Sequence, residues 1–192
     1  MEMNLGIKKI GSGHPAFIVA EMSGNHDGKI KNAISLIKSA KDAGADAIKL
    51  QTYSAESITM NVENKDFFLD DESPWSDNKT LWDLYSKAET PLEWHEELFY
   101  QAKKIGLEIF SSPNHNTLIA HVAKKNKPVI FSTGVADKED IELAIKTVCE
   151  NSNKPQIILL QCNSAYPSPY EDSNLITISD MYDTFKVIPG YS

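Results

Sequence analysis

The stretch that decides the fold is AFIVAEMSGNHDGKIKNAISLIKSAKDAGADAIKLQTY, residues 16–53. It opens with an apolar run typical of a strand and closes with a second such run, residues 47–53. Between these runs, Gly44 stands where a helix would end, and apolar residues recur at helical spacing: Ile30, Ala33, Ile34, Ile37 and Ala40. The pattern predicts one βαβ unit, in which a helix joins two parallel strands.

The same alternation of strand-like apolar runs and helical patterns continues along the chain and predicts an α/β fold with a parallel sheet. Strand candidates occupy residues 16–21, 47–53, 107–112, 128–133, 157–162 and 186–190. Most of them are apolar on both faces, as a sheet covered by helices requires.

Two further helices carry start signals. Thr90-Pro91-Leu92-Glu93 has the form of an N-cap, a first-turn proline and a capping-box glutamate, ahead of an apolar stripe that ends at Gly106. Asp137 is the expected cap of the next helix. A weaker helical pattern covers residues 117–125.

Residues 54–89 form a connection far longer than the ~2 to 6 residues that usually follow a strand. Such a segment either serves the site, for example as a lid, or is packed down on the fold by Trp82, Leu84 and Tyr85. The sequence leaves both interpretations open.

Composition excludes several classes of protein. The chain has 192 residues, 41% of them hydrophobic, which suits one globular domain, and its net charge of -8 argues against binding to nucleic acid. No apolar run approaches the roughly 18 residues of a membrane span, so a soluble, cytoplasmic protein is expected. Cys149 and Cys162 lack zinc-site or disulfide spacing and are expected to be reduced core thiols.

Ligands of parallel sheets bind at the carboxyl ends of the strands, and polar residues gather at these positions. They are Glu21, Lys49, Ser112, Ser132, Ser164, Tyr166 and Ser192. A carboxylate, a lysine and several hydroxyls at one rim indicate a site for an anion, above all a phosphate, without identifying a reaction.

Each of these residues also has a purely structural interpretation. Glu21 could accept hydrogen bonds from nearby backbone N–H groups, and serines often end strands for reasons of turn geometry. Lys49 is harder to explain in this way, because a buried lysine is costly without a partner or ligand. Of the histidines, His26 is expected at the surface and His95 in a structural role.

Several blocks, in their order and spacing, resemble the sialic acid synthase family, and most closely its pseudaminic acid synthases. They are FIVAEMSGNHDG, AKDAGADAIKLQTY, LWDLYSKAETPLEWHEELF, IFSSP, KPVIFSTGVA, LLQCNSAYPSPYEDSNL and the terminal PGYS. The resemblance implies a TIM-type (β/α)8 barrel that condenses phosphoenolpyruvate with an N-acetylated amino sugar, giving a nonulosonic acid and phosphate. It also implies a divalent metal, Mn²⁺ or Mg²⁺, that orients the sugar aldehyde, and a homodimer.

The resemblance assigns roles to the polar residues. Glu21 matches the family's catalytic carboxylate, which handles a proton beside the sugar. The other matches are substrate contacts: Lys49 and Ser164 for phosphoenolpyruvate, Ser112 and Ser132 for its phosphate or carboxylate, Tyr166 for the sugar, and Ser192 in a segment that the family writes Gly-Leu-Ser-Asp-His.

The sequence also departs from the family. After Pro113 about half to two thirds of a βα unit is expected to be missing, the two metal-binding histidines have no counterpart, and no C-terminal antifreeze-like domain follows. Residues 1–192 are therefore expected to form one incomplete barrel domain with about six strands, lacking the fourth-strand region and the last strands. An inactive remnant that binds phosphoenolpyruvate or another anion is the alternative to an active synthase, and a Schiff-base aldolase using Lys49 is a third possibility.

Overall fold

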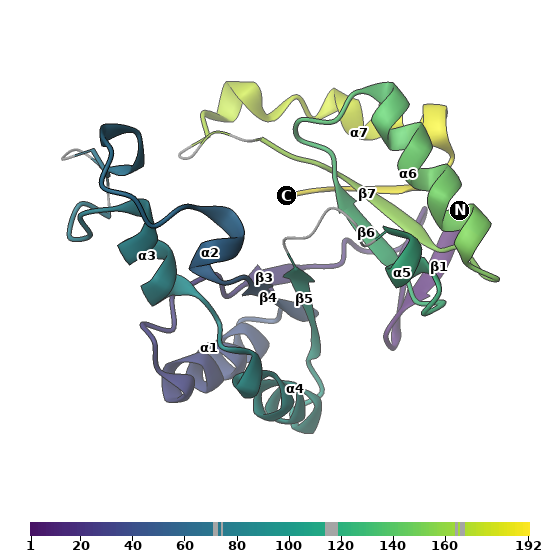
Figure 1. Cartoon of the computed structure of the whole chain (residues 1–192). Helices are drawn as coiled ribbons and strands as arrows, with labels where there is room; N and C mark the ends of the chain where they lie inside the picture. Colours follow the sequence, from purple (N-terminus) through teal and green to yellow (C-terminus); the bar gives the residue numbers. More distant parts are fainter. Residues whose placement is uncertain (71–72, 74, 114–118, 164, 166–167) are drawn as a thin grey trace. The chain divides into compact units, whose positions relative to one another are not determined.

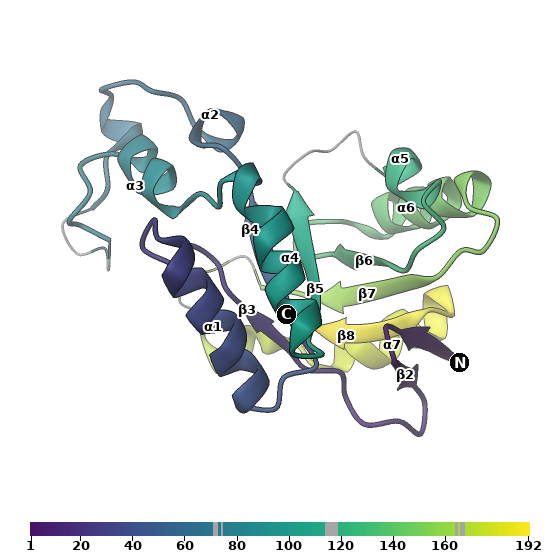
Figure 2. The ribbon, with the colours of Figure 1, turned by 90° about the horizontal axis from the view of Figure 1, so that it is seen from below.

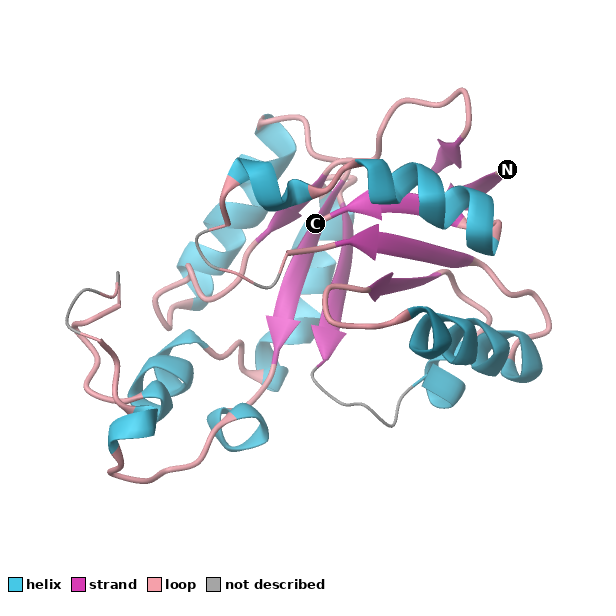
Figure 3. Cartoon of the chain, turned by 90° about the horizontal axis from the view of Figure 1, so that it is seen from above, coloured by secondary structure: helices cyan, strands magenta, loops and turns pink. Residues whose placement is uncertain are grey.

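The computed structural model describes the chain except for residues 71–72, 74, 114–118, 164 and 166–167. The backbone divides into two compact units, residues 17–114 and residues 1–16 with 115–192. Each unit contains a three-stranded parallel sheet, whose strands run in one direction within that unit (Figure 3). The expected α/β class with parallel strands is confirmed, whereas closure into a barrel and a single domain stay predictions.

The unit of residues 17–114 is built on strands β3 (Val19–Glu21), β4 (Ala47–Thr52) and β5 (Glu108–Pro113), in the order β3-β4-β5. Helices α1 (Ile30–Asp42) and α4 (His95–Lys104) lie side by side against one face of this sheet (Figures 1 and 2). The core between sheet and helices consists of Met22, Ala33, Ile37, Ala40, Ile48, Leu50, Leu98, Ala102 and Leu107.

Helix α1 follows the predicted pattern, and Gly44 adopts a left-handed φ of +87° just after it, as expected. The predicted start of the next helix is wrong. Pro91 has a ψ of 137°, so the chain is not yet helical there; a 3-10 turn, η2 (Leu92–Trp94), precedes α4. Thr90 is no N-cap, and its buried hydroxyl bonds to His26 instead.

The long segment of residues 54–89 has structure of its own. It contains α2 (Ala55–Ile58), the 3-10 turn η1 (Lys65–Phe67) and α3 (Leu81–Ala88). Tyr85 packs edge-on against Tyr53 with ring centroids 5.9 Å apart, and Glu89 Oε2 accepts the Ala55 N–H at 3.2 Å. The packing interpretation is confirmed for Tyr85, and a role as a lid stays a prediction.

The other unit contains strands β6 (Val129–Ser132), β7 (Ile157–Gln161) and β8 (Ile188–Tyr191), paired in that order. Its helices are α5 (Ile119–Ala123), α6 (Lys138–Asn151) and α7 (Ile176–Phe185), with a 3-10 turn, η3 (Tyr170–Ser173). The core between them consists of Ala123, Val148, Ile157, Leu159, Met181 and Val187. Asp137 caps α6 as predicted, accepting the Asp140 N–H at 2.9 Å.

Two features of this unit were not expected. Strands β1 (Glu2–Leu5) and β2 (Lys8–Gly11) form an antiparallel hairpin that the apolar-run pattern missed, because both strands are short and half of their residues are exposed. Cys149 lies exposed on α6, so the prediction of a core thiol is wrong there, while Cys162 is half-buried. Both cysteines are free. Among the described residues, no helix is both long and apolar enough to cross a membrane.

Leu98 is fully buried between α4 and the sheet, so Leu98→Ala is expected to lower the free energy of unfolding by about 2–5 kcal/mol. Leu92, 72% exposed in the adjoining turn, is the matched control. Leu92→Ala should change the free energy of unfolding by less than about 0.5 kcal/mol. Urea denaturation of the full chain measures both. Similar small losses in the two variants would contradict this core.

Candidate functional site

Glu21, the last residue of β3, and Lys49, the third residue of β4, form an ion pair across the two strands. The two residues are direct partners in the strand register, and Lys49 Nζ lies 2.7 Å from Glu21 Oε2. The Glu21 side chain is 42% exposed and that of Lys49 27%, so a solute can reach both charged groups. The carboxylate explains how a lysine is accommodated within an apolar strand, and the structure thus brings two predicted site residues together.

Strand alternation separates these polar groups from the core. Ile48 and Leu50 of β4 pack against the helices, whereas Lys49 and Gln51 point to the opposite face of the sheet. The register places Ser112 opposite Gln51 in β5. The backbone of Ser112 is therefore where the sequence predicted it, while its side chain lies outside the described part of the structure.

A hydroxyl network secures the ends of β4 and β5. His95 Nδ1 lies 3.2 Å from the Pro91 carbonyl, which can only accept, so this nitrogen carries the proton. His95 Nε2 must then accept the Thr52 hydroxyl, whose oxygen is 2.7 Å away. The Thr52 oxygen can then only accept a proton from the Ser111 hydroxyl, which also lies 3.2 Å from the Leu50 carbonyl. The structural role predicted for His95 is confirmed.

His26 is completely buried, so the prediction of a surface position is wrong. Its Nδ1 accepts the Gly28 N–H at 3.2 Å, and its Nε2 lies 3.2 Å from the Thr90 hydroxyl. Trp94 packs edge-on against the ring, with centroids 5.3 Å apart. Burial lowers the pKa of His26, an effect that Asp27 partly opposes. Thr90 and Trp94 lie more than 60 residues away in the sequence, and no local pattern indicates this contact.

Tyr53, directly after β4, is a residue near the strand ends that the sequence analysis missed. Burial, together with Tyr85 and Glu89, raises its pKa to about 12. Tyr53 is therefore a neutral phenol throughout the physiological pH range.

In the other unit, two predicted serines stand at the carboxyl ends of strands. Ser132 is the last residue of β6, and Ser192 directly follows β8, where its N–H donates to the Gln161 carbonyl at 2.9 Å. Both residues are exposed, and their strands flank β7 on either side. Ser164 and Tyr166 lie outside the described residues, so their predicted roles are untested.

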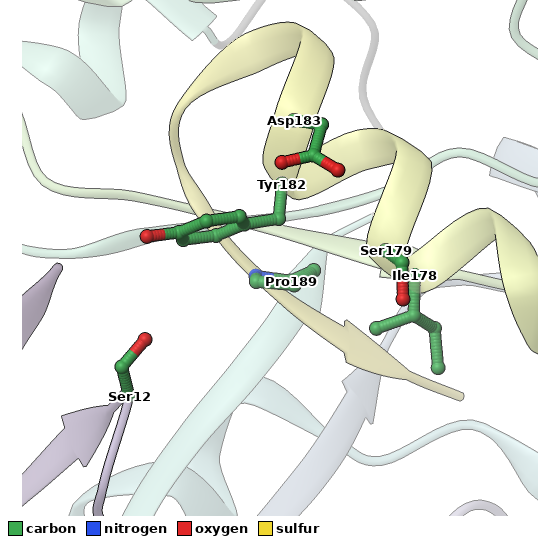
Figure 4. A pocket seen from close by; sticks show the side chains of 6 residues that line it. All are labelled: Ser12, Ile178, Ser179, Tyr182, Asp183 and Pro189. Carbon is green, nitrogen blue, oxygen red and sulfur yellow. The ribbon is translucent and has the colours of Figure 1, made fainter.

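A hollow of about 390 Å³ lies elsewhere in the same unit (Figure 4). Its lining includes Tyr182 and Asp183 near the end of α7, Pro189 in the first half of β8, and Ser12. No predicted site residue lines this hollow, and Pro189 precedes the carboxyl end of β8. The hollow is therefore not the candidate site.

The side chains that the structure describes offer no set of metal ligands. No group of three or more His, Cys, Asp or Glu residues within the described part of the chain is arranged to hold a metal ion. The carboxylate at the candidate site, Glu21, is paired with an ammonium instead. The metal that the resemblance implies does not fit the described residues, and no chemical step is assigned to it.

Thr52 tests the hydroxyl network. Thr52→Val removes the hydroxyl that links His95 to Ser111 and should lower the free energy of unfolding by about 1–2 kcal/mol. Thr52→Ser keeps the hydroxyl and should stay near the wild-type value. Thermal and urea denaturation compare the variants, and equal stability of Val and Ser variants would argue against the network.

Known proteins resemble this chain over most of its length. The sequence profile of the NeuB family matches residues 36–117 and 114–192. The chain is 38% identical over 200 residues to the pseudaminic acid synthase of Campylobacter jejuni, covering 92% of the chain and 57% of that enzyme. It is 31% identical over 214 residues to the N,N'-diacetyllegionaminic acid synthase of Legionella pneumophila, covering 97% and 60%. The chain thus spans less than two thirds of these relatives.

Solved structures agree with the sequence comparison. The N-acetylneuraminic acid synthetase of Leptospira borgpetersenii superposes with a TM-score of 0.82 at 28% identity, covering 100% of this chain and 69% of that one. A 3-deoxy-D-arabino-heptulosonate 7-phosphate synthase of Thermotoga maritima, with a TM-score of 0.51 at 14% identity, shares the fold alone. The resemblance seen in the sequence is confirmed: the chain belongs to the NeuB family.

Proposed function

We propose that this chain carries the phosphoenolpyruvate-binding and catalytic residues of a transferase in carbohydrate biosynthesis, one that makes a nonulosonic acid of the pseudaminic type. The observation that carries the proposal is the Glu21–Lys49 pair between two adjacent parallel strands, with both side chains accessible to solutes. The relatives support the class of product, since they are synthases of pseudaminic and legionaminic acids. The substrates would be phosphoenolpyruvate and an N-acetylated amino sugar.

Lys49 would bind an anionic group of phosphoenolpyruvate. An ammonium already held in place by a carboxylate offers a preorganised charge for a phosphate or a carboxylate. The Glu21 carboxylate, 2.7 Å from Lys49 Nζ, would then lie beside the bound substrate. Ser132 and Ser192 would donate hydroxyl groups to phosphate or carboxylate oxygens, and the same role is proposed for Ser112 and Ser164, with Tyr166 on the sugar.

The reaction would form one carbon–carbon bond and break one bond to phosphate. C3 of phosphoenolpyruvate attacks the sugar aldehyde, water adds at C2, and the resulting tetrahedral carbon expels inorganic phosphate to leave a 2-keto acid. The aldehyde oxygen gains a proton and the water loses one, so a single carboxyl group can pass the proton. We assign that task to Glu21.

The wider assembly belongs to the same proposal. We infer that the two units contribute strands to a (β/α)8-type barrel and that the protein acts as a homodimer. The divalent metal that the resemblance implies would need ligands from outside the described residues. Because the described residues supply no ligand set, this chain's part is limited to binding anions and moving the proton.

An anion-binding protein without turnover is the second candidate. One observation favours it: the two segments that match the family profile meet at residues 114–117, where the sequence analysis places a missing part of a βα unit. The phosphate contacts of that part would be lost with it. Such a protein would bind phosphoenolpyruvate through Lys49 but release no phosphate.

Lys49→Met tests the binding role. Loss of one charge-assisted contact is expected to weaken phosphoenolpyruvate binding about 10- to 100-fold in calorimetry, whereas Lys49→Arg should keep part of it. Lys38→Met, which removes an exposed lysine of α1, is the charge-matched control and should bind like wild type. Equal binding by Lys49→Met and wild type would refute this assignment.

Glu21→Gln separates catalysis from binding. The variant removes the proton carrier, so sugar-dependent phosphate release should fall about 10²- to 10⁴-fold while phosphoenolpyruvate still binds. Phosphate release is measured with Mn²⁺ and each candidate N-acetylated amino sugar in turn. Binding without release in the wild type, with every sugar, would instead support the anion-binding protein.

A further inference from the structure

Two segments far apart in the sequence meet around His26 in the unit of residues 17–114. One is the loop of residues 22–29, which directly follows Glu21. The other comprises residues 88–94, which begin at the end of the long segment 54–89 and lead into α4. His26 Nε2 lies 3.2 Å from the Thr90 hydroxyl, and the His26 ring packs edge-on against Trp94. We refer to this contact between the two segments as the clasp.

The backbones also approach closely in the clasp. A Cβ atom added at Gly24 would lie 2.6 Å from the Ala88 Cβ and 2.9 Å from its Cα. Only glycine leaves room for this approach, since a side chain of any size would push the two segments apart. The clasp therefore joins the segments through main-chain contact as well as through His26.

The hydrogen bonds define the protonation state of His26. Its Nδ1 accepts the Gly28 N–H, so the proton of the neutral ring must be on Nε2, which donates to the Thr90 hydroxyl. The ring is fully buried, and both contacts require this one tautomer. A second proton on Nδ1 would point at the Gly28 N–H and break that bond.

The charges around His26 are few. Within its own loop, Asp27 favours the protonated ring, but its carboxylate is paired with Lys29 at 3.0 Å. From residues 88–94 the ring meets the neutral Thr90 and Trp94, while α1 supplies the neutral Asn32, whose amide donates to the His26 carbonyl at 3.1 Å.

The carboxylates that flank these neighbours are engaged elsewhere or exposed. Glu89 accepts the Ala55 N–H at the base of α2, and Glu93 lies at the surface. No carboxylate among the contacts described for the ring pairs with it.

The loop held by the clasp directly follows Glu21, the last residue of β3. Met22 N–H donates to the Lys49 carbonyl at 3.0 Å, and the loop then passes through left-handed φ values at Ser23 (49°) and Asp27 (52°). Non-glycine residues adopt this conformation only at a cost of order 1 kcal/mol or more, so the surrounding contacts must hold the loop in place.

We propose that neutral His26 is a positioning residue. It fastens the loop of residues 22–29 to residues 88–94, so that the direction of Glu21, just before the loop, and the order of the end of segment 54–89 are set together. The link to catalysis rests on the proposed function of Glu21. The clasp itself rests on the contacts alone and can be tested without any substrate.

Acid should open the clasp. The pKa of His26 is lowered from 6.5 in the folded chain, so the unfolded state binds more protons once the pH falls below 6.5. The stability contributed by neutral His26 is complete above pH 6.5 and is lost as the pH falls through the lowered pKa. The titration of this one ring would thereby loosen both segments.

Two matched pairs of variants test the clasp by hydrogen exchange of the full chain, read by mass spectrometry at pH 7.5. His26→Asn keeps an acceptor for the Gly28 N–H but cannot reach Thr90, and Thr90→Val removes the hydroxyl from the other side. Each should raise exchange in residues 81–90 and 22–28 at least about 10-fold, because opening no longer breaks a buried hydrogen bond. Helix α6 in the other unit is the internal control and should exchange as in wild type.

Thr90→Ser restores the hydroxyl and should restore protection. The double variant His26→Asn with Thr90→Val should exchange no faster than either single variant, because both break the same contact. Unchanged exchange of residues 81–90 in folded Thr90→Val would overturn the proposal. Should His26→Asn fail to fold, Thr90→Val and Thr90→Ser decide the question by themselves.

The pH arm compares wild type with His26→Gln, whose amide can donate toward Thr90 but does not titrate. Between pH 7.5 and 5.5, after correction for the intrinsic exchange rate, residues 81–90 should lose protection in wild type and not in His26→Gln. The same pH dependence in both proteins would show that another group titrates and would refute the role of His26.

A final readout connects the clasp to Glu21. If the protein releases phosphate, Thr90→Val should lower kcat more than phosphoenolpyruvate affinity, and Thr90→Ser should recover it; an unchanged kcat would limit His26 to a structural role and refute positioning. If no phosphate is released, the proposed function fails, and the exchange experiments still decide the clasp.

Discussion

The alternation of side chains along β4 is the constraint on which the unit of residues 17–114 depends. Successive residues of a strand point to opposite faces, so Ile48 and Leu50 can enter the core only if Lys49 and Gln51 face away from it. A shift of register by one residue would bury the lysine among α1 and α4. The hydrophobic core and the charged pair with Glu21 are therefore two consequences of the same register.

Polar contacts secure the places that apolar packing cannot reach. The core of this unit ends where β4 and β5 end, and there His95, Thr52 and Ser111 join the strand termini through a chain of hydroxyl groups. His26 performs a similar task for the loop after β3 by joining it to Thr90. His95 is the first residue of α4, and His26 packs against Trp94 just before it. The two rings carry their proton on different nitrogens, His26 on Nε2 and His95 on Nδ1. Such buried polar groups favour one arrangement of loops because any other arrangement leaves them unsatisfied.

The two units present different chemistry at their strand ends. The unit of residues 17–114 offers a carboxylate and an ammonium, and the other unit offers serine hydroxyls at Ser132 and Ser192. The Lys49 ammonium already has a partner in Glu21, and the serine hydroxyls carry no charge.

The sequence by itself determined the elements whose signals are local. Periodicity located the three strands of each parallel sheet and helix α1, and short-range chemistry located the Asp137 cap and the left-handed Gly44. It also placed Glu21 at the end of one strand and Lys49 within the next, because alternation and strand termination are properties of neighbouring residues. Their direct pairing needed only that these two strands be adjacent.

Only the tertiary structure decided the features that depend on distant partners. His26 became buried because Thr90 and Trp94, more than 60 residues away, close over it, and the same contact removed Thr90 from its expected place as a helix cap. Cys149 became exposed because α6 turns Val148 rather than its neighbour toward the core. A sequence pattern records which residues can be buried, whereas the contacts between separate segments decide which of them are, since burial is a property of the packed chain.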